Sequence, residues 1–357
     1  MNRLIDRIKA IADVASDWRD PEHPPRIDAR EKTLEAPNRW TKQSLTHALN
    51  QWMQHLTVER LENWVGTDTL DESMRVGVVH AAGGPLAGLQ DALAVWALGH
   101  EYLGHVPDSS PVILPAFAEE VRDRGAGFSI NFGGEETVYQ EAQALLAQLH
   151  ESSQQAIVSL CENHDIQPDA RLVRPCVYSV GVVDGHESDD EMERLAEDML
   201  LFEGAGRRRL AVLWAPENHS PDSYLQAMAR FRGLFPAHPD TPGTLQMQQA
   251  FLDARDQPHA YADGLEFLVS RGDPDPQRPG HVRWSEYESI GAIAEWANRR
   301  GEAVYSFIAR SGLHDQLPLE QRIRTPGGVH IPPLDDREGR EIVTFLRTVH
   351  TNSAHSE

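Results

Sequence analysis

Cysteine, lysine and long apolar runs are all scarce in this chain of 357 residues. The two cysteines, Cys161 and Cys176, are too few for a disulfide framework or a thiolate metal site. The longest apolar run near the middle, 92–98, is too short to cross a bilayer. Residues 1–18 alternate charged and apolar side chains at helical spacing, which is not the pattern of a signal peptide. We therefore expect a cytoplasmic protein without a membrane span.

The charge balance is strongly acidic. Asp and Glu number 55 against 33 Lys and Arg, which gives a formal net charge of -22, and the only lysines are Lys9, Lys32 and Lys42. Such a surface repels phosphate backbones and anionic lipid, so neither nucleic acid nor a membrane surface is an expected partner. A composition of 40% hydrophobic and 7% aromatic residues is typical of a globular protein with a buried core.

Segments with strand character alternate with helical segments along most of the chain. Residues 1–65 are predicted to form helices around a proline-rich turn at 21–25. In the next part, strands are predicted at 76–79 and 128–132, and helices at 86–98 and 138–149. Later strands are predicted at 177–183, 210–214, 265–269, 282–284 and 304–308, and later helices at 188–202 and 290–300. This alternation predicts largely parallel sheets.

Common metal and hydrolase motifs do not occur in the sequence. His100-Glu101 followed by His105 resembles a zinc-protease helix, but the spacing of five rather than four would turn the two rings away from each other. The chain has no Gly-x-Ser-x-Gly sequence and no P-loop lysine motif, which argues against a serine hydrolase and a nucleoside triphosphatase. No metal site is predicted.

Four segments together carry a family resemblance. The motif VGVVHAAGGPL at 76–86, with the residues that follow it to Leu114-Pro115, resembles the LuxC-type fatty acyl-CoA reductases of the aldehyde dehydrogenase superfamily. Segments 38–41, 179–216 and 282–308 resemble the same family in the same order. The resemblance therefore covers most of the chain.

The resemblance implies a fold and a reaction. The fold is α/β and aldehyde dehydrogenase-like, with two Rossmann-like parallel-sheet domains and a short C-terminal return. Its expected parts are an N-terminal helical segment 1–65, a cofactor-binding-like domain 66–176, a catalytic-like domain 177–322 and the return 323–357. The family uses NADPH and a nucleophilic cysteine to reduce fatty acyl-CoA to fatty aldehyde. Acyl-CoA or another acyl ligand is the implied ligand, and a homo-oligomer or an active paralogue is an implied partner.

The catalytic positions that the resemblance implies are substituted in this chain. The turn that carries the nucleophile reads GAGRR at 204–208, so Arg207 stands at the cysteine position. A guanidinium group stays protonated and cannot form an acyl thioester. The position of the family's oxyanion asparagine holds Gly83, which has no side-chain donor, and a family lysine expected at the cofactor aligns with His105. We therefore expect lost or reduced reductase activity.

A second glycine turn bears on the cofactor. Gly133 and Gly134 end a predicted strand ahead of a helix, a place that can hold a pyrophosphate on backbone amides. Glu135 and Glu136 occupy the first helical positions, where their charges repel a phosphate. The sequence therefore predicts a weakened NADPH site.

Alternatives remain open at this point. An active NADPH-dependent reductase could use Cys176 as a displaced nucleophile, or could transfer hydride directly to a bound thioester. The arginines at 207–209 could bind a carboxylate or a CoA phosphate, or could pair with surrounding acids. The chain could also be a structural or regulatory module that uses the cleft only as an interface.

Overall fold

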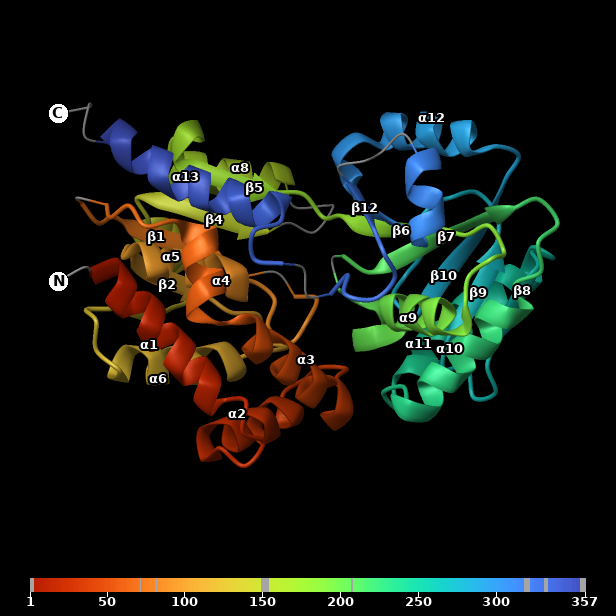
Figure 1. Ribbon diagram of the computed structural model, residues 1–357, viewed down its shortest axis with the longest axis horizontal. Coiled ribbons are helices and arrows are strands. Elements are labelled where there is room, and N and C mark those ends of the chain that lie inside the picture. Colours follow the sequence, from red (N-terminus) through yellow and green to blue (C-terminus); the bar gives the residue numbers. More distant parts are fainter. Residues whose placement is uncertain are drawn as a thin grey trace. The chain divides into compact units, whose positions relative to one another are not determined.

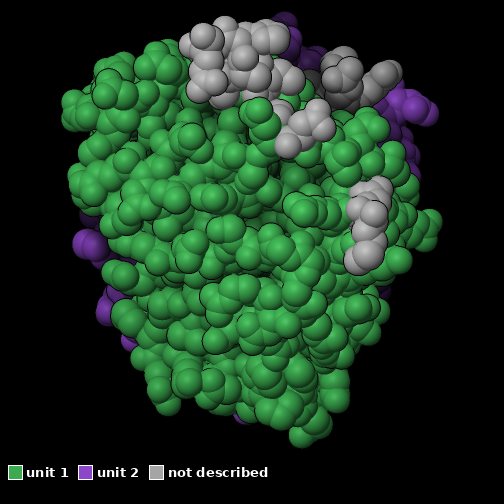
Figure 2. Space-filling model, turned by 90° about the vertical axis from the view of Figure 1, so that its left-hand side faces the viewer, with its two compact units in different colours: residues 1–38, 45–176, 332–357 green, residues 39–44, 177–331 purple. Residues whose placement is uncertain are grey.

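The computed structural model describes residues 3–70, 72–80, 82–148, 154–206, 208–317, 322–330 and 333–353. The chain divides into two compact units. Unit 1 comprises Met1–Asn38, Leu45–Cys176 and Pro332–Glu357, and unit 2 comprises Arg39–Ser44 and Val177–Ile331. Figure 2 shows unit 1, in green, as one continuous body. Within the described ranges, no helix combines the length and apolar character needed to cross a membrane.

Unit 1 is built on a five-stranded parallel sheet in the order β3-β2-β1-β4-β5. Its strands are β1 (Arg75–Val79), β2 (Glu101–His105), β3 (Ile130–Phe132), β4 (Ala144–Gln148) and β5 (Arg171–Arg174). The chain starts at β1, moves outward through β2 and β3, and then continues on the other side of β1 with β4 and β5. The order therefore reverses between β1 and β4. Open parallel sheets bind their ligands at such a point, outside the carboxyl ends of the strands.

Helices cover both faces of this sheet (Figure 1). They are α1 (Arg3–Asp17), α2 (Pro24–Glu35), α3 (Lys42–His55), α4 (Val58–Val65), α5 (Leu89–Leu98), α6 (Ile113–Asp123), α7 (Glu135–Glu141), α8 (Gln154–Asn163) and α13 (Arg337–Ser353), with a 3₁₀ turn η1 (Pro168–Ala170). Every residue of α5 is buried, because α5 packs on β1 and β2 and is covered by α1, α4 and α13. Its sequence LQDALAVWAL is accordingly apolar on most sides.

Unit 2 contains a seven-stranded sheet in the order β12-β11-β6-β7-β10-β9-β8, in which only β8 runs antiparallel to its neighbour. Its strands are β6 (Tyr178–Val182), β7 (Leu210–Pro216), β8 (His259–Tyr261), β9 (Leu268–Arg271), β10 (His281–Tyr287), β11 (Val304–Ile308) and β12 (Ile323–Arg324). After β6 the chain moves to β7 and beyond, and it later returns to the other side of β6 with β11. The strand order of this sheet therefore reverses between β6 and β11.

The helices of unit 2 are α9 (Asp189–Leu200), α10 (Asp222–Leu234), α11 (Thr241–Ala254) and α12 (Ile290–Arg300), with 3₁₀ turns η2 (Leu201–Gly204), η3 (Gly301–Ala303) and η4 (Ser311–Gln316). The predicted capping box opens α9: Ser188 Oγ accepts from the Glu191 amide, and the Glu191 carboxylate accepts from the Ser188 amide at 2.8 Å. α9 then packs against α10.

The sheets confirm the predicted α/β class, but several predicted elements were wrong. The helix predicted at 138–149 is α7, which ends at Glu141, followed by β4. Every residue of β4 is buried, so its sequence does not alternate between apolar and polar residues as a half-exposed strand does. Its run of leucine and alanine therefore led to the prediction of a helix. Likewise, the 101–105 segment of the rejected zinc motif is a strand. The strand expected at 265–269 lies at 268–271, and β2, β5, β8 and β12 were not predicted.

The predicted four-part division stays a prediction. In the structure, residues 39–44 group with unit 2 and the rest of 1–65 groups with unit 1. The chain passes between the units after Cys176, and the return 323–357 is shared, with 323–331 in unit 2 and 332–357 in unit 1.

Candidate functional site

The carboxyl edge of the unit 1 sheet carries a buried polar group of side chains, which we call the edge cluster. It consists of three residues that follow or end strands, His80, Gln148 and Arg174, together with Asp91 of α5 and Tyr102 from within β2. Arg174 donates to the Asp91 carboxylate at 2.5 Å, and Gln148 donates to the same oxygen at 3.3 Å. His80 Nε2 lies 2.6 Å from the Tyr102 hydroxyl. The edge cluster therefore lies beside the reversal of strand order.

The edge cluster contains more hydrogen-bonding capacity than it uses. Among the described residues, Arg174 Nε, Arg174 Nη1 and Asp91 Oδ1 have no hydrogen-bond partner, although both side chains are buried. Such groups normally contact an ordered polar molecule such as water. Burial lowers the pKa of His80 to about 4, while Asp91 opposes that shift, so His80 is neutral near pH 7 and is not a general acid there.

A glycine allows the His80 ring to lie against the start of α5. Gly88 is the N-cap residue of α5 with φ of 81°, and a Cβ atom there would lie 1.6 Å from His80 Nδ1. The predicted site residue Gly83 lies in the loop between β1 and α5 and is half-buried. Gly83 has no side chain and therefore no donor for an oxyanion.

The structure brings three predicted cofactor residues together. His105 ends β2, and its Nδ1 donates to the Gly133 carbonyl at 3.3 Å. Gly134 is the N-cap residue of α7, and Glu135 and Glu136 occupy the first turn of α7. α7 has seven residues and begins with two carboxylates, so the side chains at this turn do not fit a pyrophosphate.

In unit 2, the segment 202–204 ahead of β7 forms a turn that we call the strained turn. Phe202 and Glu203 have φ of 54° and 58°, and Gly204 has φ of 63°. Non-glycine residues in this left-handed conformation cost about 1–3 kcal/mol each and persist only where other contacts hold them. A Cβ atom on Gly204 would lie 2.8 Å from the Met199 carbonyl, so glycine is required there.

A buried ion pair holds the strained turn. Glu203 is 7% exposed, and its carboxylate accepts from Arg232 Nη1 at 3.1 Å and from Arg232 Nη2 at 3.4 Å. The Thr241 hydroxyl also donates to Glu203. Arg232 on α10 and Thr241 on α11 thereby tie the strained turn to two helices. The sequence analysis did not identify Glu203, because acids are too frequent in this chain for one of them to carry a signal.

Arg207, the residue at the family's nucleophile position, lies outside the described residues. Of its neighbours, the Arg208 guanidinium lies 5.0 Å from the centre of the Tyr305 ring, and Arg209 donates to the Gln277 carbonyl at 2.6 Å. Arg209 therefore fixes the start of β7 to the loop before β10. An anion site formed by these arginines stays a prediction.

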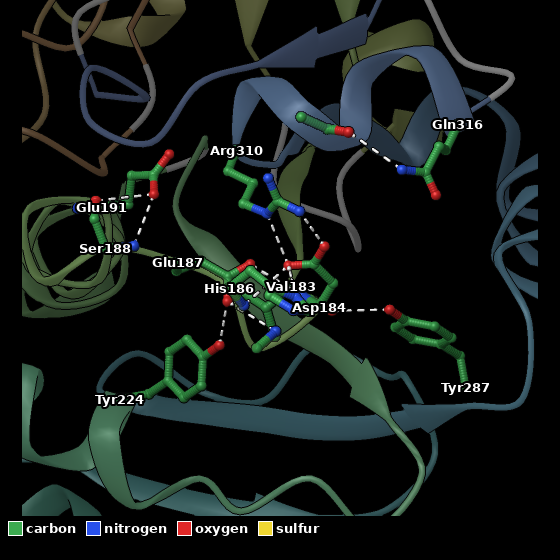
Figure 3. A network of polar contacts seen from close by, with 12 residues as sticks. Val183, Asp184, His186, Glu187, Ser188, Glu191, Tyr224, Tyr287, Arg310 and Gln316 are labelled. Atoms are coloured by element: carbon green, nitrogen blue, oxygen red, sulfur yellow. Dashed lines mark hydrogen bonds and ion pairs between the residues drawn. The ribbon is translucent and has the colours of Figure 1, made fainter.

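The carboxyl edge of the unit 2 sheet is closed by polar contacts (Figure 3). Arg310, which follows β11, donates to Asp184, which follows β6, with a distance of 2.8 Å from Nε, so this ion pair occupies the reversal of strand order. The Arg310 guanidinium lowers the pKa of Asp184 to about 2. Glu187 accepts from the amide of Asp184 at 3.0 Å and from the Tyr224 hydroxyl. Sequence reasoning missed this network, because no motif contains these residues.

Neither cysteine lies on the segment that the resemblance assigns to the nucleophile. Cys161 is buried in α8, and burial raises its pKa. Cys176 is half-buried in the connection between β5 and β6, outside any strand. No group of three or more His, Cys, Asp or Glu side chains in the described part of the chain is placed to hold a metal ion.

Comparison with known proteins identifies the fold. No family model and no curated protein matches the sequence. Among solved structures, an oxidoreductase from Marinobacter aquaeolei is 8% identical, with a TM-score of 0.68 over 91% of this chain and 77% of that one. An aldehyde dehydrogenase C variant from Pseudomonas syringae, complexed with NAD+ and octanal, is 10% identical, with a TM-score of 0.66 over 91% of this chain and 77% of that one.

A third solved structure agrees with these two. Betaine aldehyde dehydrogenase from Staphylococcus aureus in complex with NAD+ is 11% identical, with a TM-score of 0.67 over 91% of this chain and 75% of that one. The chain therefore has an aldehyde dehydrogenase-like fold, which confirms the predicted fold. At these identities the likeness describes the fold alone.

Proposed function

Starting from this fold, we propose that the protein is a relative of the acyl-CoA reductases in which thiol-dependent reduction of acyl thioesters is lost or strongly reduced. The family reaction converts fatty acyl-CoA and NADPH to fatty aldehyde. The observation that carries the proposal is the turn before β7, which reads GAGRR at 204–208 and contains no thiol. The proposed ligand is an acyl compound, and the proposed protein partners are a second copy or an active paralogue.

The chemistry of the available side chains supports the proposal. Covalent reduction of a thioester needs a thiolate that accepts the acyl group and later releases it as aldehyde. The Arg207 guanidinium stays protonated and forms no such bond. Cys161 is a poor replacement, because a buried thiol with a raised pKa holds little thiolate at pH 7.

The cofactor side of the reaction is weakened for a separate reason. A bound nicotinamide dinucleotide supplies the hydride in this family. In this chain, Glu135 and Glu136 place two carboxylates where a phosphate would approach α7. The His105 imidazole donates to the Gly133 carbonyl, and an imidazole carries no permanent charge comparable to that of the family's lysine. We therefore expect weak binding of NADPH.

One observation favours a second candidate, an active reductase that uses Cys176. This thiol is half-buried, lies outside the strands and follows Arg174 of the edge cluster by two positions. In this candidate, Cys176 takes the role that the family gives to the residue at position 207.

The two candidates differ in one measurable product. The full chain is incubated with fatty acyl-CoA of several chain lengths, and its intact mass is measured beside that of the Cys176→Ser variant. We expect unchanged masses for both proteins. An acyl adduct on the wild type that is absent from Cys176→Ser would instead establish the second candidate. Thermal unfolding with and without NADPH then reports whether the cofactor binds.

A further inference from the structure

A small pocket in unit 2 borders the strained turn. It has a volume of about 230 Å³ and is lined by residues of the strained turn and the position after it, of α11, of the segment that precedes α3 and of the loop before β10: Arg39, Glu203, Ala205, Thr241, Thr244 and Pro279. We call it the Arg39 pocket. A water-sized group occupies roughly 30 Å³, so the pocket admits about seven or eight such groups. This is the size of a small ligand and far below that of coenzyme A.

The polar groups in the wall of the Arg39 pocket are already satisfied. Both carboxylate oxygens of Glu203 accept from Arg232, and one of them also accepts from Thr241. The Thr244 hydroxyl donates to the Asp240 carbonyl at 3.1 Å. The remaining wall consists of Ala205 and Pro279, so the pocket offers a largely apolar surface.

Arg39 is the exception. It is exposed, and among the described residues it has neither an ion pair nor a side-chain hydrogen bond, in a chain whose formal net charge is -22. Two of the lining residues are charged, Arg39 and Glu203, and the Glu203 carboxylate is already paired with Arg232 behind the wall, so Arg39 is the one lining charge that no described residue pairs. An apolar cavity with a single unpaired cation at an exposed position matches a ligand with an apolar body and one anionic end.

We propose that the Arg39 pocket binds a short unbranched fatty acid, with its carboxylate paired to Arg39 and its chain beside Ala205 and Pro279. The choice of an acyl chain rests on the proposed function; the charge and the size of the ligand rest on the pocket. A thioester has no anionic carbonyl end to pair with Arg39, and its coenzyme exceeds the pocket. The ligand is therefore the free acid.

The strained turn gives this assignment a second basis. Backbone strain concentrates at ligand and active sites, where the surrounding contacts hold it. Here the strain places Glu203 in the pocket wall, and the buried Arg232 and Thr241 fix it there. The pocket is thereby preorganised, which lowers the entropy cost of binding.

Isothermal titration calorimetry of the full chain with straight-chain alkanoates tests the proposal. We expect saturable binding for chains of about four to eight carbons, the range that a cavity of this size admits, and weaker binding of the alcohol of equal length. Arg39→Gln should weaken alkanoate binding at least about tenfold, the loss expected for one charge-assisted hydrogen bond. Arg39→Lys should recover part of it. Arg299→Gln, which changes an exposed arginine of α12 outside the pocket, should bind as the wild type does.

A second variant tests the position of the chain. Ala205→Leu places a larger side chain in the cavity and should abolish binding, with thermal unfolding used to verify that the variant is folded. The proposal is overturned if the wild type binds no alkanoate, or if Arg39→Gln and folded Ala205→Leu both bind with unchanged affinity. Alkanoate binding does not depend on an acyl adduct, so this outcome is separate from that of the thioester experiment.

Discussion

Single residues fix the environment of the carboxyl edge in unit 1. Gly88 lets the His80 ring reach Tyr102, and the charges of the buried pair Asp91 and Arg174 act on the same ring. Position 88 requires glycine for two reasons: its backbone is left-handed, and the His80 ring lies too close for a Cβ atom.

Replacing this glycine should be costly. Gly88→Ala adds left-handed strain of about 1–2 kcal/mol and overpacking of about 1–3 kcal/mol against His80, so we expect the free energy of unfolding to fall by about 3 kcal/mol. Urea denaturation measures the change. Gly84→Ala is the matched control in the same loop: a Cβ atom there meets nothing within 4 Å, and stability should change by less than about 0.5 kcal/mol. Equal effects of the two substitutions would contradict this account.

A second histidine provides a pH test in unit 2. His281 is buried, its Nδ1 donates to Gln248 at 2.7 Å, and its Nε2 lies 2.7 Å from the Ser270 hydroxyl. Through these two hydrogen bonds, the neutral His281 ring of β10 connects Ser270 of β9 with Gln248 of α11. Burial, followed by the neighbouring charge of Arg283, lowers the pKa of His281 from 6.5 to about 3.

The sign of the pH effect follows from proton uptake. Below pH 6.5 the unfolded chain binds a proton at His281 that the folded protein takes up only near pH 3, so stability falls as pH falls through this window. One such group contributes up to about 1.4 kcal/mol per pH unit. His281→Gln should therefore show a shallower loss of stability between pH 6.5 and about 4, measured by urea denaturation at several pH values. An unchanged slope would show that the pKa of His281 is not lowered by folding, which would contradict this account.

At the scale of elements, the strained turn depends on contacts from two helices. Glu203 has an unfavourable backbone conformation and a buried charge, and both are held by Arg232 of α10 and Thr241 of α11. Breaking a buried pair leaves an uncompensated charge, whereas an exposed pair contributes little. α10 carries an arginine of each kind: Arg232 belongs to the buried pair with Glu203, and Arg230 belongs to an exposed pair.

Two substitutions on α10 separate these cases. Arg232→Met leaves Glu203 buried without its cation and should lower the free energy of unfolding by about 3–5 kcal/mol. Arg230→Met removes an exposed pair with Glu193, whose side chains are 46% and 55% exposed, and should cost less than about 1 kcal/mol. Denaturant unfolding of both variants provides the comparison. Similar costs for the two would mean that the Glu203 pair does not hold the strained turn.

Local signals determined which elements could be predicted. The strand at 304–308 and the helix at 290–300 have the bounds of β11 and α12, and the capping box at Ser188 marks the start of α9. Each has a local signal, either a run of β-formers or an end residue. β4 has none, because a central parallel strand rich in alanine and leucine matches helix propensity better than strand periodicity.

At the scale of the whole molecule, the polar sites at the sheet edges depend on the order of the strands in each sheet. This order cannot be predicted from local sequence patterns. His105 and Gly133 were each assigned to the cofactor, the first from the family resemblance and the second from its glycine turn, but their contact depends on the pairing of β3 with β2, a strand that the sequence did not predict. The contact between Asp91 and Arg174 joins residues 83 positions apart and requires β4 and β5 to lie on the other side of β1. The Arg39 pocket likewise joins residues distant in sequence, so no local pattern could predict it.

The central proposal is that this chain resembles the acyl-CoA reductases but lacks the thiol chemistry of that family. Consumption of NADPH by enzyme at stoichiometric concentration, in the presence of fatty acyl-CoA, tests this claim most directly, because hydride transfer to an acyl group oxidises one NADPH for each aldehyde formed. The account predicts no consumption above that of a sample without protein. Consumption accompanied by fatty aldehyde, and absent in Cys176→Ser, would contradict it.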